Sequence, residues 1–157
     1  MQLGYIGLGN MGGALARRLM REHQLRAFDL RPEVLGRFAE LGAVPTQSAQ
    51  ALARASDMVT TCLPTSAEVR DVRFGEGRVA EVLQPGQIIA DMTTGDPGET
   101  REMAARLAEK GVRIGHQRAI RRRFTGHDGG VQPRRIPQGS RPLERLAIED
   151  AIANHLA

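Results

Sequence analysis

Three glycines, Gly7, Gly9 and Gly12, follow a short apolar segment and precede an amphipathic stretch. Gly7 permits a tight bend from strand to helix, Gly9 lets backbone amides approach a pyrophosphate, and Gly12 permits close packing of the helix on the strand. A helix N-terminus carries unpaired N–H groups and about half a positive charge, so it can hold an anion without Lys or Arg. The sequence therefore predicts that the phosphates of a dinucleotide bind at Gly7-Leu8-Gly9-Asn10-Met11-Gly12.

An acidic residue, Asp29, stands 22 residues after Gly7, at the end of a second predicted strand, Leu25 to Phe28. A carboxylate at this spacing accepts hydrogen bonds from the adenosine ribose hydroxyls of NAD and repels a 2′-phosphate. Arg31 instead favours NADP, because a guanidinium near the ribose can bind the 2′-phosphate of that cofactor. We expect NAD as the cofactor, with NADP as the alternative. A third interpretation makes Asp29 only a turn residue before Pro32, which begins the next helix.

The composition narrows the class of protein. The chain has 157 residues, 41% of them hydrophobic, and contains no long apolar run, so we expect one domain and no membrane span. No charged leader precedes an apolar block, and the single cysteine can form no internal disulfide, so a cytoplasmic location is expected. Cys62 lies in an apolar run and is interpreted as a small buried side chain rather than a nucleophile. No cluster of metal ligands is recognised.

Strand and helix signals alternate along most of the chain. In the first predicted helix, Met11, Leu15 and Leu19 recur at spacing four and are expected to form the buried face. The pattern indicates an α/β fold, a Rossmann-type doubly wound parallel sheet whose ligand crevice lies at the carboxyl ends of the strands. Strands are predicted at residues 3–6, 25–28, 43–44, 57–63, 87–92 and from 112, and further helices at 32–41, 48–55, 67–72, 78–83 and 97–110. Ser48 and Asp96 are the expected N-caps of two of these helices, and Pro97 is the expected first residue of the last.

Two later segments add to the glycine turn. They are Cys62-Leu63-Pro64, which closes the strand beginning at Asp57, and Asp91-Met92-Thr93-Thr94-Gly95-Asp96-Pro97. With these three motifs in this order, residues 1 to about 115 resemble the β-hydroxyacid dehydrogenases, the family of 3-hydroxyisobutyrate dehydrogenase, tartronate semialdehyde reductase and the NADP-binding domain of 6-phosphogluconate dehydrogenase. The resemblance implies hydride transfer between a nicotinamide and a small β-hydroxyacid.

The resemblance also implies further cofactor-binding residues. In that family the Leu-Pro pair lies beside the dinucleotide, and the Asp-x-Thr-Thr loop lies near the nicotinamide and the substrate. Leu63, Pro64 and Thr94 therefore join the glycines as expected binding residues, with Glu68 a weaker candidate. The alternative is that Thr93 and Thr94 only cap the turn before the next helix.

After Gly115 the resemblance ends. The family continues into Asp-Ala-Pro-Val-Ser-Gly-Gly, which holds the substrate carboxylate, whereas this chain has His116-Gln117-Arg118-Ala119-Ile120-Arg121-Arg122-Arg123. The family's all-α second domain carries a catalytic lysine, but Lys110 of this chain belongs to the cofactor domain. We therefore assign no catalytic residue and expect a small hydroxyacid as a ligand only with a substrate domain. The alternative function is a binding-only or regulatory module.

Charge changes at the same point. Residues 1–115 carry 14 basic and 14 acidic side chains, whereas residues 116–157 carry eight Arg and four acidic residues. We expect a dinucleotide-binding domain over 1–115 and an irregular Arg-rich tail over 116–157. A shifted reading frame or a truncation is favoured over true divergence of the tail. A nucleic-acid arm is disfavoured because Phe124 is its one aromatic residue. Apolar surface left exposed without a second domain favours self-association.

Overall fold

The computed structural model describes residues 1–75 and 77–116. Of the predicted tail, 116–157, only His116 is described, as the last residue of a strand, and the rest lies outside these residues. Within the described part, six strands form one parallel sheet in the order β3-β2-β1-β4-β5-β6. The strands are β1 (Leu3–Ile6), β2 (Leu25–Phe28), β3 (Val44–Pro45), β4 (Met58–Thr61), β5 (Ile88–Asp91) and β6 (Arg113–His116). The helices are α1 (Asn10–Leu19), α2 (Pro32–Glu40), α3 (Ala49–Arg54), α4 (Ser66–Phe74), α5 (Val79–Val82) and α6 (Pro97–Ala108).

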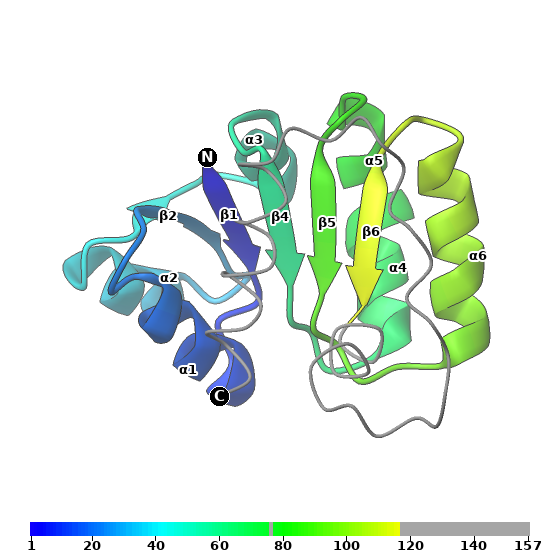
Figure 1. Cartoon of the computed structure of the whole chain (residues 1–157). Helices are drawn as coiled ribbons and strands as arrows, with labels where there is room; N and C mark the ends of the chain where they lie inside the picture. The colour runs from blue at the N-terminus through cyan, green and yellow to red at the C-terminus, as the bar shows by residue number, and fades with distance from the viewer. Residues whose placement is uncertain (76, 117–157) are drawn as a thin grey trace, which may run out of the picture. The chain divides into compact units, whose positions relative to one another are not determined.

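The chain adds strands first on one side of β1 and then on the other, and this places helices on both faces of the parallel sheet. From β1 the chain first moves toward β3 and then returns to β4 and continues toward β6. Because crossovers between parallel strands are right-handed, α1 and α2 cover one face and α3 to α6 the other (Figure 1). The predicted Rossmann-type doubly wound fold is confirmed, and the carboxyl ends of its strands share one edge.

Burial of the strands follows their place in the sheet. Every residue of β1, β4 and β5 is buried, as expected for central parallel strands covered on both faces. The edge strand β3 is exposed and contains Pro45, a residue that edge positions tolerate because it donates no ladder hydrogen bond. The apolar core beneath α3, α5 and α6 is centred on Leu52, Val59, Val79, Ile89 and Leu107.

The ends of two helices are fixed by the predicted caps. The Ser48 hydroxyl accepts a hydrogen bond from the Ala51 amide at 3.0 Å, where α3 begins. The Asp96 carboxylate accepts from the amides of Gly98 and Glu99 at 2.7 and 2.9 Å, where α6 begins with a proline. Both caps are confirmed, and the second fixes the loop that follows β5.

The predicted buried face of α1 was wrong in part. Met11 is 62% exposed, whereas Gly12, Ala16 and Leu19 are buried against the sheet. The contact is too close for a large side chain, because a Cβ built on Gly12 would lie 2.1 Å from the carbonyl oxygen of Gly7. The helix therefore packs through its smallest residues, and Met11 is left at the surface.

A Gly12→Ala substitution should lower the free energy of unfolding by about 1–3 kcal/mol, because the added methyl group forces α1 away from β1. Gly36→Ala is a matched control: Gly36 is exposed in α2, and an added Cβ meets no atom within 4 Å. This control should gain about 0.5–1 kcal/mol from helix propensity. Urea unfolding followed by circular dichroism measures both values. Equal stability of Gly12→Ala and the parent would contradict the close approach.

Candidate functional site

A cleft of about 680 Å³ opens at the carboxyl ends of β1, β2, β4 and β5. All but one of the predicted site residues line it: Gly7, Gly9, Asn10, Met11, Gly12, Asp29, Arg31, Leu63, Pro64, Glu68 and Thr94. The exception, Leu8, is buried and takes part through its backbone. The fold thus brings together residues that were predicted from segments far apart in the sequence. The sequence analysis did not single out Asp71 and Val72, which line the same cleft from α4.

The glycine turn leaves the N-terminus of α1 open toward this cleft. Gly7 has φ of +95°, and a Cβ on it would lie 2.3 Å from the Cys62 carbonyl oxygen, so only glycine is accommodated there. Gly9 is different, because the nearest atom to an added Cβ is Arg31 Nη2 at 3.9 Å. No side chain caps α1, and its first turn contains no acidic residue. Its amides and dipole therefore favour an anion.

The carboxylate of Asp29 joins the glycine turn to the end of β2. One oxygen, Oδ2, accepts a hydrogen bond from the Leu8 amide at 2.7 Å. The Arg31 guanidinium donates to both oxygens, from Nε at 2.9 Å and from Nη2 at 3.0 Å, and the Arg31 amide donates at 3.0 Å. The Asp29 side chain is 8% exposed, whereas that of Arg31 is 53% exposed. Arg31 can therefore move into solvent or toward a ligand while Asp29 stays in place.

The charge state of Asp29 follows from these contacts. Burial alone raises its pKa, but the hydrogen bonds from Arg31 and Leu8 and the positive charge of Arg31 outweigh burial. The pKa of Asp29 is therefore lower than usual, and the pKa of Arg31 is raised by the same pairing. The pair is charged at neutral pH.

A second, smaller cavity of about 330 Å³ shares Gly9, Asn10 and Arg31 with the cleft. Arg17 and Arg37 also line it, and the Arg17 guanidinium lies over the Phe38 ring at 5.0 Å from its centroid. Three guanidinium groups around one cavity favour an anion. No sequence motif indicates this cavity, because Arg17 and Arg37 come from α1 and α2 and share no common pattern with Arg31.

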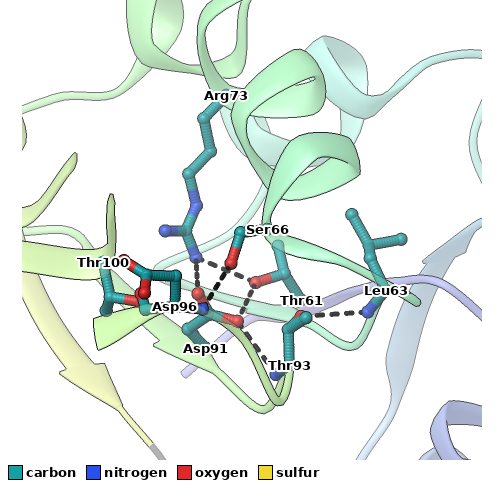
Figure 2. Close-up of polar contacts among 8 residues, drawn as sticks. All are labelled: Thr61, Leu63, Ser66, Arg73, Asp91, Thr93, Asp96 and Thr100. Carbon is teal, nitrogen blue, oxygen red and sulfur yellow. Dashed lines mark hydrogen bonds and ion pairs between the residues drawn. The ribbon is translucent and has the colours of Figure 1, made fainter. Parts of the chain in front are cut away.

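The loops after β4 and β5 form the other wall. The Leu63 amide donates to the Thr93 hydroxyl at 3.0 Å, and the Thr93 amide donates to Asp91 Oδ1 at 3.0 Å (Figure 2). Thr93 is buried, whereas Thr94 is exposed and lines the cleft. The alternative in which both threonines only cap the following turn is wrong for Thr93, since its hydroxyl holds the neighbouring strand's loop.

Beneath this wall lies a buried ion pair that the sequence analysis did not anticipate. Arg73 of α4 is fully buried, and its Nη2 lies 3.1 Å from Asp91 Oδ2 and 2.9 Å from Thr61 Oγ1. Thr61 in turn donates to Asp91 Oδ1 at 3.3 Å. Burial lowers the pKa of Arg73, and the neighbouring Asp91 opposes that effect. No local pattern distinguishes this arginine from the exposed Arg70 on the same helix.

Cys62 lines the cleft and is only partly buried, which corrects the prediction of a buried side chain. Burial nevertheless raises the pKa of its thiol, so the thiol is protonated at neutral pH. Among residues 1–75 and 77–116, no three His, Cys, Asp or Glu side chains come together as metal ligands. None of the helices in the same residues has the length and apolar character needed to cross a membrane.

Comparison with known proteins agrees with this geometry. The family described as the NAD binding domain of 6-phosphogluconate dehydrogenase matches residues 2–115. The chain belongs to this family. A probable mitochondrial 3-hydroxyisobutyrate dehydrogenase of Dictyostelium discoideum is 38% identical over 109 residues, which are 69% of this chain and 34% of that protein. The predicted resemblance to the β-hydroxyacid dehydrogenases is confirmed.

Solved structures of related enzymes match the same domain. The 3-hydroxyisobutyrate dehydrogenase of Mycobacterium tuberculosis, solved with L-serine, is 28% identical, has a TM-score of 0.67, and is matched over 74% of this chain and 40% of its own. Psf3, solved with NADP⁺ and 2-OPP, is 29% identical, has a TM-score of 0.68, and is matched over 71% of this chain and 40% of its own. The chain therefore spans little more than a third of the length of these family members.

In this family domain, Asp29→Asn should lower the free energy of unfolding at pH 7 by about 1 kcal/mol, a modest value because solvent screens the exposed Arg31. The folded pKa of Asp29 is lowered, so its stabilisation is present above the pKa of the unfolded chain and lost as pH falls through the folded value. Urea unfolding at a series of pH values should show the two proteins converge below about pH 4. A difference that stays constant with pH would contradict the ion pair.

Proposed function

We propose that this domain binds a nicotinamide dinucleotide and serves as the cofactor half of a β-hydroxyacid dehydrogenase. The observation that carries the proposal is the open N-terminus of α1, which faces the cleft across Gly9 with no capping side chain. A Cβ on Gly9 would project into open space, so a diphosphate can approach the backbone amides there. The residues present therefore suit the cofactor that the family implies.

The order of the strands suggests how the cofactor lies. The pyrophosphate is held by Gly9, Asn10 and the first turn of α1, and the adenosine ribose lies at the end of β2 beside Asp29. The nicotinamide then extends toward Leu63-Pro64 and Thr94, at the ends of β4 and β5. The nicotinamide would accept or donate a hydride, and these residues hold and orient it.

NAD is the proposed cofactor, since the Asp29 carboxylate can accept hydrogen bonds from the ribose hydroxyls and repels a 2′-phosphate. NADP is the second candidate, and a specific observation favours it. Arg31 can exchange Asp29 for a phosphate, and the adjoining cavity adds Arg17 and Arg37. The related Psf3 was solved with NADP⁺.

The rest of the proposal concerns the whole protein. We propose a small β-hydroxyacid as the substrate class, following the names of the relatives, and a cytoplasmic location on the ground of the single cysteine. The 157-residue polypeptide itself is proposed to bind cofactor without turnover, as a dinucleotide-binding domain over 1–115 followed by a frameshifted or truncated tail. A binding-only or regulatory module is the alternative function.

Gly9→Val should weaken dinucleotide binding about 100-fold, because its branched side chain would occupy the space that the pyrophosphate needs. The fold should stay intact, since the nearest atom to an added Cβ outside the neighbouring backbone is Arg31 Nη2 at 3.9 Å. Titration calorimetry with NAD and NADP measures the affinity, and circular dichroism checks the fold. Binding retained in Gly9→Val would refute the proposed phosphate site. The same samples, assayed for NAD reduction with a panel of small β-hydroxyacids, should show no turnover, and measurable turnover would refute a binding-only polypeptide.

Asp29→Ala should reduce the affinity for NAD about tenfold and leave that for NADP equal or higher, because it removes both the ribose acceptor and the repulsion of a phosphate. The matched variant Arg31→Ala should weaken NADP and spare NAD. The ratio of the two dissociation constants in each variant is the measurement. A ratio unchanged by Asp29→Ala would identify Asp29 as a turn residue alone.

A further inference from the structure

The buried arginine of α4 lies at the junction of three segments that line the cleft. Arg73 is fully buried, as are its partners Asp91 and Thr61. The helix that carries Arg73 also supplies Glu68, Asp71 and Val72 to the cleft wall. The position of this wall therefore depends on how α4 is attached to the sheet.

The attachment is a continuous chain of polar contacts (Figure 2). Arg73 joins α4 to Thr61 at the end of β4 and to Asp91 at the end of β5. Asp91 then accepts the Thr93 amide, and the Thr93 hydroxyl accepts the Leu63 amide. The loop after β4, the loop after β5 and α4 are thus tied to one another through a single guanidinium. All three lie on the side of the cleft away from Asp29.

A gain in stability is a weak explanation for the pair. The Nε and Nη1 groups of Arg73 have no hydrogen-bond partner among the described residues, so part of the cost of burying this charge is uncompensated there. Replacing a buried ion pair by well-packed apolar side chains of similar volume is often neutral or stabilising. Apolar side chains cannot supply a directional contact that fixes three segments at once.

We propose that Arg73, acting through Asp91, is the positioning residue for the nicotinamide end of the cofactor cleft. The inference rests on the proposed dinucleotide binding. The Arg73–Asp91 pair sets the spacing of Leu63-Pro64, Thr94 and α4 without touching the ligand. The adenosine end, built from the glycine turn and β2, contributes no residue to this network of hydrogen bonds and ion pairs.

The test compares a ligand with a nicotinamide to one without it. In the double variant Arg73→Met, Asp91→Asn, no buried charge is left unpaired, and the Asn oxygen still accepts the Thr93 amide. NADH should bind about tenfold more weakly and lose its fluorescence enhancement, because a misplaced wall no longer encloses the nicotinamide. ADP-ribose, which has no nicotinamide, should keep its affinity within about twofold. The melting temperature is measured alongside.

A matched control exists on the same helix. Arg70 forms an ion pair with Glu99 of α6 at 2.5 Å, and both side chains are partly exposed and outside the cleft. Arg70→Met with Glu99→Gln should change neither ligand's affinity nor the NADH emission.

Each other outcome has a defined meaning. The inference is overturned if the Arg73, Asp91 double variant binds NADH as tightly as the parent protein does. It is also overturned if the variant loses affinity for NADH and ADP-ribose to the same extent. Loss of the folded state overturns it too, because the pair would then be a requirement of the fold rather than of the cleft. Failure of the parent protein to bind ADP-ribose would instead refute the proposed dinucleotide site.

Discussion

The close contact of three backbone segments at the end of β1 is the constraint on which the cleft depends. The carbonyl of Gly7 lies against Gly12 of α1, and the carbonyl of Cys62 lies against Gly7, at distances that leave no room for a Cβ. The start of α1 and the exit of β4 are therefore held side by side. The open amides at the start of α1 and the Leu63-Pro64 wall consequently line one cleft rather than two separate loops.

The carboxylate of Asp29 adds a second constraint, because it contacts both the turn and the cleft. Its hydrogen bond to the Leu8 amide fixes the glycine turn, and its pairing with Arg31 holds a guanidinium at the mouth of the cleft. Under the proposed function, a ribose hydroxyl would share this carboxylate with Arg31 or displace it. The choice between NAD and NADP would then depend on Asp29, on Arg31 and on the arginines of the adjoining cavity.

The sequence predicted the features that depend on local signals. Glycine spacing, caps such as Ser48 and Asp96, and apolar runs located the strands and the turn, because each signal acts within a few residues. The prediction that Met11 lies on the buried face of α1 was wrong, because residue spacing cannot show that the helix lies too close to the sheet for a large side chain. Arg73, Arg17 and Arg37 were missed for a related reason. Arginines on helices are usually exposed, and only the packing of distant segments determines that Arg73 is buried and that Arg17 and Arg37 line one cavity.

The position of β1 in the sheet also has a consequence for how the chain folds. Leu3 pairs with Leu25 of β2 on one side, 22 residues later, and with Met58 of β4 on the other, 55 residues later. The pairing of β1 with β2 can therefore form early, whereas the other edge of β1 stays unpaired until β4 docks. Such long-range parallel pairing is slow and leaves apolar strands open to aggregation. Because the cleft spans the pairing of β1 with β4, its two sides come together only once β4 has docked on β1.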